Sequence, residues 1–586
     1  QRKEVGLCLL DLSKAFDSVP HWAVEGALRA KGFDDDTVAV VRSFYEGAIT
    51  RFYVSAGETD QATPIRILNG VRQGCPLSPY LFNTVLDHAL QEINGDDSRG
   101  VRIGSSRVTA AAFADDLVIF GNSRFELQNT IDRVFALLTA AGLSFNARKS
   151  MTVRLTPVRG KKIMKVISKP EFHVGDDTIP CARVSESVRY LGLDISPAGA
   201  SIRDRLGKLT SWLRNVQKYR LKPEQRVEIV RSTVLGKLAY SLRNSNVNRQ
   251  ILEQMDRAIR GYMKKVLHLP PGTPNAWFYM NTRQGGLGLR QLRLSIPTER
   301  ARALEGLSDL DDGVMHEVRS ASQKELEALI RMAHGETRGA RQARLKGEFL
   351  RTEWGKYAGA MTASEASYAP IFGGHAEVGG HKLVRLAQFL SGNLPTRSAL
   401  HRGHTLTDQL SVRCRKCGLW CETEAHVLSG CGQMKDAYVR RHDRLVEILA
   451  QGLSSGRREV FPEMEYQLRG ERFRPDVTCV TADRVDVVEV SVPFAHSPCY
   501  LEERGRQKEE KYIRPSFLEA VGRRFPGRSI SVRSVVIGCR GEIPSRTKCS
   551  LTDLGIWHLR NRFQRSALFG SLWVFDVFRS QAGEYG

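Results

Sequence analysis

The spacing of hydrophobic residues changes several times along the chain of 586 residues. Residues 5–12 (VGLCLLDL) are apolar nearly throughout, which is typical of a buried strand. Residues 107–121 predict two short apolar strands on either side of an acidic turn. Helical spacing is found in residues 21–31, 34–47, 76–93 and 125–141. The third helix starts at a proline, and the fourth stops at a glycine. Together these segments predict an α+β domain that extends to about residue 197.

A second pattern begins near residue 201. From there to about 268, periodic Leu, Ile and Val are interleaved with Arg and Lys, which predicts basic amphipathic helices. Pro-Pro-Gly at 270–272 and GGLGL at 285–289 predict an irregular connection. Residues 297–360 are again helical and highly charged, and they carry no chemical motif.

The C-terminal third contains a short segment rich in Cys and His (405–435), then an α/β pattern over 455–545. The 11 cysteines are odd in number and cluster near one position, which favours a metal site in a reducing compartment over a disulfide framework. Lys and Arg number 87 against 64 Asp and Glu, a net charge of +23. This surplus favours a polyanionic partner over an ordinary basic surface. Since no apolar run is long enough to span a bilayer, we expect no membrane partner.

The acidic turn at Asp115–Asp116 differs from the other Asp-Asp pairs of the chain. It is flanked by AAAF and LVIF, so we expect it at the tip of a hairpin with a buried body. Two adjacent carboxylates are costly to bury without a counter-charge, and a merely solvated turn fits these flanks poorly. Asp11, at the end of the first strand, adds a third carboxylate and increases the repulsion. Two Mg²⁺ ions would remove it, and would activate a 3′-hydroxyl and stabilise the leaving pyrophosphate.

Five segments in this order resemble the reverse transcriptase of non-LTR (type-1) retrotransposons. They are DLSKAFDSVPH (11–21), NGVRQGCPLSPYLFN (69–83), FADD (113–116), GLSFNARKS (142–150) and YLG (190–192). The resemblance implies a right-hand polymerase palm followed by a helical thumb that grips the duplex through phosphate contacts. It also implies an RNA template, dNTP substrates, and Asp11, Asp115 and Asp116 as Mg²⁺ ligands.

The resemblance also implies roles for single residues. Phe16 would pack under the sugar and exclude a ribonucleotide's 2′-hydroxyl, although a lone Phe is more often core. Gln73 and Gly74 would contact template and nucleotide, glycine allowing close backbone approach. Lys149 would protonate the pyrophosphate or pair with its charge. Tyr190 would belong to the primer-grip hairpin, or to the core.

The sequence departs from the family at its start. In the family, fingers precede the first palm motif and supply basic residues for the triphosphate. Here the chain begins ten residues before Asp11, so we expect the fingers to be missing.

The Cys- and His-rich segment reads C-x2-C-x8-H-x4-C. Three thiolates and one imidazole form a closed, structural Zn²⁺ site, and zinc binding supplies the folding energy of so short a segment. The four ligands are Cys414, Cys417, His426 and Cys431. Cys421 is a spare thiol that could replace a ligand, and Trp420 could stack on a base. The pattern, with LPTR before it (394–397), resembles the zinc knuckle of the R-two group of retrotransposons, whose members often insert at a fixed site.

Residues 474–492 predict two apolar strands joined by a polar turn, with Asp476 at the start of the first strand and Glu489 on the second. This layout resembles the hairpin of restriction-like nucleases, PD-(D/E)xK, whose carboxylates hold Mg²⁺. Asp486 is a rival to Glu489. It lies an odd number of residues away and so faces the opposite side of the strand.

The match lacks one element of the motif. The usual lysine position, two residues after Glu489, holds Ser491. In R-two-type endonucleases the lysine is displaced to a downstream helix, near a tyrosine. KEEKY (508–512) supplies Lys508, which the spacing to the tyrosine favours, and Lys511 as second choice. Without the upstream domains, an ordinary α/β domain explains this region equally well. A further alternative is that residues 455–545 form a module that only binds DNA.

These observations predict a multidomain α+β fragment of a retrotransposon polyprotein. Its endonuclease would nick chromosomal DNA in the nucleus, after synthesis in the cytoplasm, and the 3′-hydroxyl would prime reverse transcription of element RNA. The alternatives are a maturase-like reverse transcriptase of group II introns, whose His-rich nuclease is not seen here, and a domesticated or inactive nucleic-acid-binding remnant. The predicted domains are palm 1–197, thumb 198–296, helical linker 297–404, CCHC knuckle 405–440, and PD-(D/E)xK-like α/β endonuclease with tail 441–586.

Overall fold

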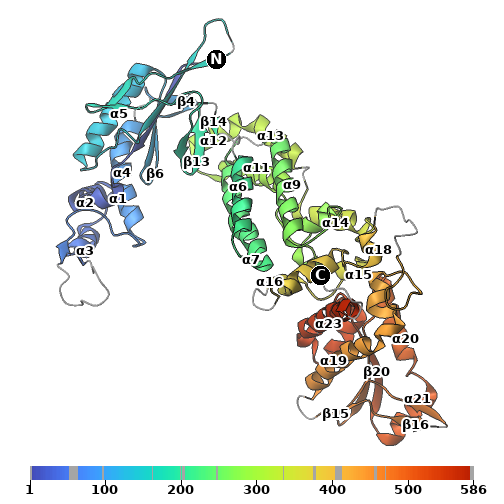
Figure 1. Cartoon of the computed structure of the whole chain (residues 1–586). Helices are drawn as coiled ribbons and strands as arrows, with labels where there is room; N and C mark the ends of the chain where they lie inside the picture. Colours follow the sequence, from blue (N-terminus) through green and yellow to red (C-terminus); the bar gives the residue numbers. More distant parts are fainter. Residues whose placement is uncertain are drawn as a thin grey trace. The chain divides into compact units, whose positions relative to one another are not determined.

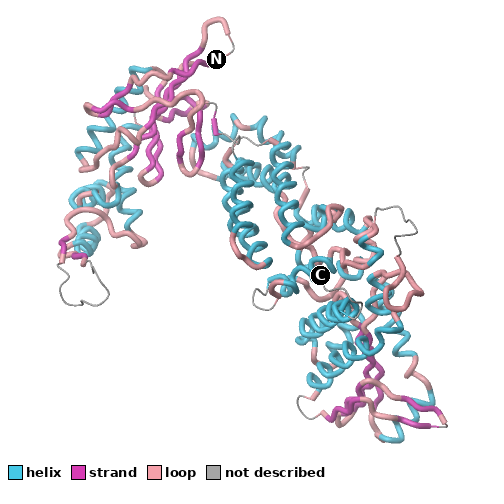
Figure 2. Tube along the Cα trace, in the orientation of Figure 1, coloured by secondary structure: helices cyan, strands magenta, loops and turns pink. Residues whose placement is uncertain are grey.

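The computed structural model describes residues 3–51, 64–95, 98–161, 163–197, 199–200, 205–245, 248–333, 336–373, 378–402, 412–454, 458–468 and 470–580. The chain forms two compact units, coloured along the sequence in Figure 1 and by secondary structure in Figure 2. The first unit contains 1–205, 238–249 and 294–334, and the second contains 206–237, 250–293 and 335–586. Among the described residues, no helix has the length and apolar character needed to cross a bilayer.

The first unit is built on an antiparallel five-stranded sheet of order β6-β7-β1-β8-β9. The strands are β1 (Val5–Asp11), β6 (Ala110–Phe113), β7 (Asp116–Gly121), β8 (Met151–Pro157) and β9 (Met164–Ile167). The predicted strand at 5–12 and the predicted hairpin at 107–121 are therefore confirmed. The apolar run of β1 is explained by its place in the middle of this sheet.

Helices pack on this sheet and on one another. They are α1 (Ala15–Ser18), α2 (His21–Ala30), α3 (Asp35–Tyr45), α4 (Ser78–Asn94) and α5 (Arg124–Ala140). Helix α5 contacts β1 and β7, and α4 lies between α2 and α5. The four longer helices match the predicted segments, and α5 ends just before Gly142, whose φ of 80° is in the left-handed region.

Short hairpins complete the unit. They are β2 (Ile49–Thr50) with β3 (Ile65–Arg66), β4 (Val101–Ile103) with β5 (Ser106–Val108), β10 (Phe172–Val174) with β11 (Asp177–Ile179), and β12 (Val188–Tyr190) with β13 (Leu193–Ser196) and β14 (Gly199–Ala200). Leu191 and Gly192 form the β12–β13 turn with φ of 46° and 74°, the twist that a two-residue hairpin favours. The Tyr240 hydroxyl donates to the Leu191 carbonyl at 2.7 Å and holds this turn.

The predicted basic helices between 201 and 360 are present, and they are divided between the two units. They are α6 (Arg205–Lys218), α7 (Pro223–Glu228), α8 (Leu235–Arg243), α9 (Arg249–Val266), α10 (Asn275–Tyr279), α11 (Leu292–Glu305), α12 (Gly313–Ala321), α13 (Gln323–Met332) and α14 (Arg338–Leu350). Pro297 lies inside α11, so the boundary predicted between thumb and linker falls within a helix.

Asp256 connects two of these helices. It lies on α9, and its two carboxylate oxygens accept from the backbone N–H groups of Leu292 and Arg293 at 2.9 and 3.0 Å. These are the first free donors of α11, so Asp256 acts as its cap from another helix. Burial raises the pKa of Asp256 to about 6, although the two N–H groups oppose this shift.

The C-terminal part of the second unit contains a four-stranded sheet of order β15-β18-β19-β20, in which β19 and β20 are parallel. Its strands are β15 (Glu459–Pro462), β18 (Val477–Val480), β19 (Arg484–Ser491) and β20 (Ser529–Val536), with the small hairpin β16 (Tyr466–Leu468) and β17 (Glu471–Phe473). The helices are α15 (Gly359–Thr362), α16 (Ala369–Gly373), α17 (His381–Leu390), α18 (Arg397–Leu400), α19 (Lys435–Leu453), α20 (Pro498–Glu510), α21 (Pro515–Arg524), α22 (Ser545–Asp553) and α23 (Arg560–Ser580).

Each strand of this sheet contacts a helix. Helix α19 lies beside α23 (Figure 1) and contacts it. It also contacts strands β15, β18 and β19, while α20 and α22 contact β20. Residues 485–490 of β19 are all buried, and they include four valines together with the charged Asp486 and Glu489. Both faces of this strand are therefore covered. The mixed strands and helices predicted for 455–545 are confirmed.

Candidate functional site

The first candidate site consists of the N-terminal carboxylates Asp11, Asp115 and Asp116. Strands β1 and β7 pair with Asp11 directly opposite Asp116, and Asp115 lies in the turn that joins β6 to β7. Ala114 in this turn has a φ of 53°, an uncommon value for a residue with a side chain. Partial burial raises the pKa of Asp116, and the charges of Asp115 and Asp11 raise it further.

The prediction that the Asp-Asp pair stands on a buried body is wrong for one of its two strands. Leu117 to Ile119 on β7 are buried, but Phe113 on β6 is 68% exposed. Strand β6 is the edge of the sheet, so no strand of the described residues pairs with its outer side. Asp115 and Asp116 are themselves exposed, and water screens their repulsion.

Motif residues near these carboxylates have different surroundings. Phe16 stacks on Phe82 with ring centroids 4.6 Å apart and packs against the core. Gln73 is exposed and donates from Nε2 to Asp17 Oδ1 at 3.0 Å. Gly74 has a φ of 86°, and no heavy atom lies within 4 Å of the place where a Cβ would stand. A nucleotide could therefore approach the backbone at this glycine.

The two remaining motif residues lie after the carboxylates in sequence. Lys149 is exposed, and only its backbone N–H is held, by Asn146. Tyr190 is half-buried at the end of β12, and burial raises its pKa, with a smaller contribution from the charge of Asp116. The structure thus brings Tyr190 close to the carboxylates, whereas Lys149 projects into solvent.

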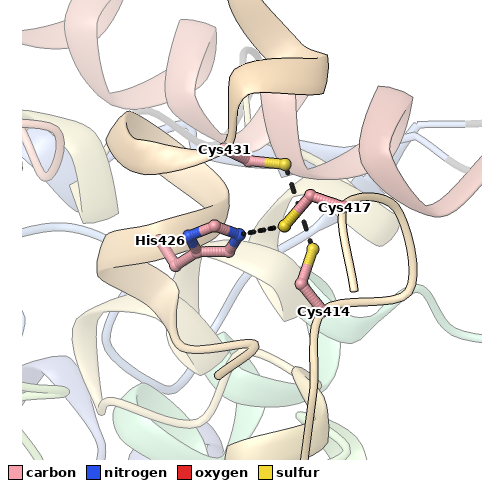
Figure 3. A group of neighbouring side chains, drawn as sticks. All are labelled: Cys414, Cys417, His426 and Cys431. Carbon is pink, nitrogen blue, oxygen red and sulfur yellow. Dashed lines mark hydrogen bonds between the residues drawn. The ribbon is translucent and has the colours of Figure 1, made fainter. Parts of the chain in front are cut away.

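The second candidate site is the cluster of three cysteines and a histidine (Figure 3). Its members are Cys414, Cys417, His426 and Cys431, and their ligand atoms all lie within 4.8 Å of one another. Cys417 Sγ lies 3.3 Å from His426 Nε2, and Cys414 Sγ lies 3.9 Å from Cys431 Sγ. Among the described residues, no other group of His, Cys, Asp and Glu meets in this way.

Local structure holds these four side chains together. Cys414 donates its N–H to the Trp420 carbonyl at 2.7 Å, closing the loop that carries the first two thiols. The other two ligands lie at the ends of a single turn, His426–Gly430, which Cys431 follows. Burial raises the pKa of Cys431 to about 12, and the neighbouring thiols oppose its ionisation as well. A bound cation reverses this balance, and three sulfurs with one nitrogen fit Zn²⁺.

Cys421 lies outside the cluster and is exposed, so it is no ligand in this arrangement. Trp420 is 67% exposed and Leu419 is 75% exposed at the tip of the loop.

The third candidate site contains the C-terminal carboxylates, Asp476 and Glu489. Strands β18 and β19 form the predicted antiparallel hairpin. The Asp476 N–H donates to Glu489 Oε1 at 3.3 Å, and the Val490 N–H donates to Asp476 Oδ2 at 2.7 Å. Glu489 is only 2% exposed. The hairpin therefore places both carboxylates side by side in a largely buried position.

The structure distinguishes the two candidate lysines. Lys508, on α20, places Nζ 2.7 Å from Glu489 Oε2. Lys511 instead donates to the Tyr512 hydroxyl at 2.9 Å. Tyr512 is fully buried and donates to the Arg474 carbonyl, and burial raises its pKa, as does the charge of Glu489. Lys508 is the lysine that meets the carboxylates.

Asp486, the rival carboxylate, is 1% exposed and forms ion pairs with Arg484 Nε at 2.8 Å and Arg533 Nε at 3.1 Å. Both arginines lie in the sheet, so Asp486 has a structural role on the face of β19 opposite Glu489.

His442 is part of this site although its sequence gave no signal. It lies on α19, and its Nε2 is 3.3 Å from Asp476 Oδ2. This hydrogen bond raises the pKa of His442. Burial favours a higher pKa for Asp476, yet the contact with His442 lowers it below its usual value. Only the three-dimensional structure brings this helix to the hairpin, 34 residues later in the chain.

A cleft of about 550 Å³ opens beside the C-terminal carboxylates. Its lining comes from the Cys/His cluster, from α19, and from α20 with the segment before it. Residues in its wall include His426, Arg441, His442, Tyr500, Arg504 and Lys508. The cleft is thus mainly basic and aromatic, which suits a phosphodiester chain.

Comparison with known proteins agrees with the motifs. Residues 1–195 match the family described as reverse transcriptase (RNA-dependent DNA polymerase). A retrovirus-related Pol polyprotein from the type-1 retrotransposable element R2 of Popillia japonica is 31% identical, over 98% of this chain and 78% of its own length. The chain belongs to this family of R2 Pol polyproteins.

Other members of the R2 family are longer. The Pol polyprotein of the type-2 element R2DM of Drosophila melanogaster is 28% identical, over 91% of this chain and 50% of its own length. The Pol polyprotein of the type-1 element R2 of Nasonia vitripennis is 27% identical, over 98% of this chain and 55% of its own length. The chain thus spans about half the length of these two relatives. Solved structures of telomerase from Candida albicans and Candida tropicalis overlap it with TM-scores of 0.22 and 0.25 at 9% and 11% identity, too low to support an argument.

Proposed function

We propose that this R2-type reverse transcriptase chain is also a metal-dependent DNA endonuclease, and that it nicks target DNA to prime reverse transcription of element RNA. The observation that carries the proposal is the geometry of Asp476, Glu489 and Lys508, which meet at one end of a hairpin. Lys508 and His442, which contact these two carboxylates, line the basic cleft beside them. The hairpin belongs to the same chain as the reverse transcriptase domain, so one polypeptide would cut the DNA and extend the cut end.

The residues of the cleft suit phosphodiester hydrolysis. Asp476 and Glu489 would hold a divalent cation such as Mg²⁺, which supplies Lewis-acid chemistry when bound. Lys508, which contacts Glu489 at 2.7 Å, would stabilise the attacking water or the negative charge on phosphorus. Arg504 and Tyr500, nearer the start of α20 than Lys508, would contact the DNA backbone and a base.

The N-terminal carboxylates would carry the polymerase reaction. Asp11, Asp115 and Asp116 lie together where β1 ends and β7 begins. Asp115 and Asp116 are exposed and Asp11 is partly exposed, so dNTP and Mg²⁺ would have access. The exposed Lys149 would pair with the pyrophosphate on binding. The proposed template is element RNA and the proposed target is chromosomal DNA, which makes the nucleus the proposed site of action.

The Cys/His cluster would hold a structural Zn²⁺ that shapes the nuclease cleft. The Tyr438 hydroxyl accepts from the Cys431 N–H at 3.1 Å and donates to the Val427 carbonyl at 2.8 Å, joining the cluster to α19. The largely buried side chains of Glu424 and Arg540 form an ion pair, with a carboxylate oxygen 2.7 Å from a guanidinium nitrogen. These contacts make the cluster part of the cleft wall rather than a separate module.

The proposal is tested by plasmid nicking with the full chain, in Mg²⁺ and in EDTA. We expect nicking in Mg²⁺ alone, a loss of about 10²-fold or more in Lys508→Met, and a change of only a few-fold in the matched control Lys511→Met. Nicking that persists in EDTA, or that survives in Lys508→Met, would contradict the assignment. Tight DNA binding by the folded protein without nicking would make the C-terminal region a binding module.

A further inference from the structure

His442 lies against the C-terminal carboxylates, yet no part of the nuclease motif accounts for it. Its Nε2 is 3.3 Å from Asp476 Oδ2, and its side chain lines the cleft that also contains Lys508. Helix α19 is not part of the β18–β19 hairpin. His442 therefore reaches Asp476 from a helix outside the hairpin.

The contact determines which oxygen of Asp476 remains available. Oδ2 faces two groups, the Val490 N–H at 2.7 Å and His442 Nε2 at 3.3 Å. Among the described residues, no group donates to Oδ1. A carboxylate whose one oxygen is held from two sides has a fixed plane, so its second oxygen points in a fixed direction.

The position of His442 is itself fixed by its neighbour in α19. Arg441 is buried, and it donates to the Val492 carbonyl at 3.1 Å, just beyond the end of β19, and to Ser571 Oγ at 2.9 Å on α23. These bonds attach this turn of α19 to the strand that carries Glu489. The backbone of His442 is thus held near the strand that carries Glu489.

The chemistry favours hydrogen-bond donation over metal ligation by His442. Mg²⁺ prefers oxygen ligands, and it seldom takes an imidazole. A carboxylate oxygen accepts hydrogen bonds, so a ring with its proton on Nε2 donates to Asp476 Oδ2. The second nitrogen, Nδ1, is 3.3 Å from Asp443 Oδ1, and it donates there as well only when the ring carries both protons.

We propose that His442 is a positioning residue of the nuclease site: it holds Asp476 Oδ2 so that Oδ1 faces the cation shared with Glu489. This inference rests on the proposed nuclease function. Groups that orient metal ligands typically contribute about 10–100-fold to metal affinity or activity. Loss of His442 should therefore weaken cation binding while the fold and the zinc content remain.

The test compares His442→Ala and His442→Gln in the full chain, with His558→Gln as a control at an exposed histidine. We expect His442→Ala to need about tenfold more Mg²⁺ for half-maximal nicking, and excess Mg²⁺ to restore most of the rate. His442→Gln, which keeps an N–H donor, should recover part of the affinity. Mn²⁺ binding by titration calorimetry, with Asp476→Asn as background, should weaken in the same order. Zinc content and Tm should stay at wild-type values.

An unchanged Mg²⁺ requirement and Mn²⁺ affinity in His442→Ala, beside a wild-type protein that nicks, would overturn the positioning role and leave the nuclease intact. A loss of nicking in His442→Ala that excess Mg²⁺ does not restore, with unchanged Mn²⁺ affinity, would overturn it as well. Absence of metal-dependent nicking by the wild-type protein would instead overturn the proposed function itself.

Discussion

The N-terminal and C-terminal carboxylates have opposite surroundings. Asp115 and Asp116 are exposed, and the charges that act on Asp116 are those of other carboxylates. Glu489 is 2% exposed, and it lies 2.7 Å from an ammonium group. Asp476 has His442 as a partner at 3.3 Å.

This difference shows two ways of keeping carboxylates together. Water screens the repulsion at the exposed site, and cations and substrate supply the counter-charge when they bind. A buried carboxylate needs a partner inside the protein before any cation arrives, since an unpaired buried charge is strongly destabilising. The C-terminal site is thus organised by its own basic groups. In the proposed nuclease reaction these groups would have to give way or turn to the phosphate.

The largest effect is expected when the proposed zinc beside the C-terminal site is lost. Cys431→Ser removes one of four clustered ligands, whereas Cys421→Ser removes the exposed thiol outside the cluster. Binding of structural zinc contributes about 10–16 kcal/mol in small zinc domains, so we expect Cys431→Ser to lose zinc, to lower Tm, and to abolish nicking. Cys421→Ser should keep zinc and nicking. Zinc content by atomic absorption, Tm and nicking are measured together, and full zinc content in Cys431→Ser would contradict the site.

The second prediction concerns the exposed site. Asp116→Asn should reduce Mg²⁺-dependent primer extension on an RNA template by about 10²-fold or more, because it removes a charge that faces the cation. Since the side chain is exposed, Tm should remain unchanged, and so should plasmid nicking. A large fall in Tm, or a loss of nicking, would show that the two sites are not independent in this way.

The smallest expected effect comes from a third kind of carboxylate, one that is buried with backbone partners. The pKa of Asp256 is about 6 in the folded chain, against 3.8 for an unperturbed Asp. Because its pKa is raised, Asp256 binds a proton more tightly in the folded state than in the unfolded state. Its contribution to the free energy of unfolding is therefore greatest at low pH and is lost as pH rises through about 6. Asn cannot titrate, so the stability of wild type relative to Asp256→Asn should be about 1 kcal/mol greater at pH 5 than at pH 7.5.

Thermal unfolding of both proteins at the two pH values provides the measurement. An equal difference in Tm at both values would contradict the raised pKa of Asp256.

Much of the fold follows from the spacing of apolar residues. The strand at 5–12, the helices of the first unit and the β18–β19 hairpin all have strong periodic signals, and the structure contains them. The exposure of Phe113 could not be predicted, because the sequence does not reveal which strand lies at the edge of the sheet. Likewise, the boundary predicted at 296/297 depended on composition, whereas α11 continues through Pro297.

The candidate sites could be predicted only as far as local spacing reaches. Strand parity correctly separated Asp486 from Glu489, because successive side chains on a strand alternate between faces. The choice between Lys508 and Lys511 depended on a family spacing, and the structure distinguishes them by the 2.7 Å contact with Glu489. His442 could not be found, because a histidine on a helix carries no mark of the strand that the helix will meet.

Glu489 and Asp486 provide the most direct test of the nuclease claim. Both are almost fully buried on one strand, and both pair with basic side chains, but they face opposite sides of the sheet. In Mg²⁺-dependent nicking by the full chain, we expect Glu489→Gln to lose about 10²-fold or more. Asp486→Asn should lower Tm and still nick within a few-fold of wild type at a temperature where it is folded. Equal nicking by Glu489→Gln and wild type, or loss of nicking in folded Asp486→Asn alone, would contradict the account.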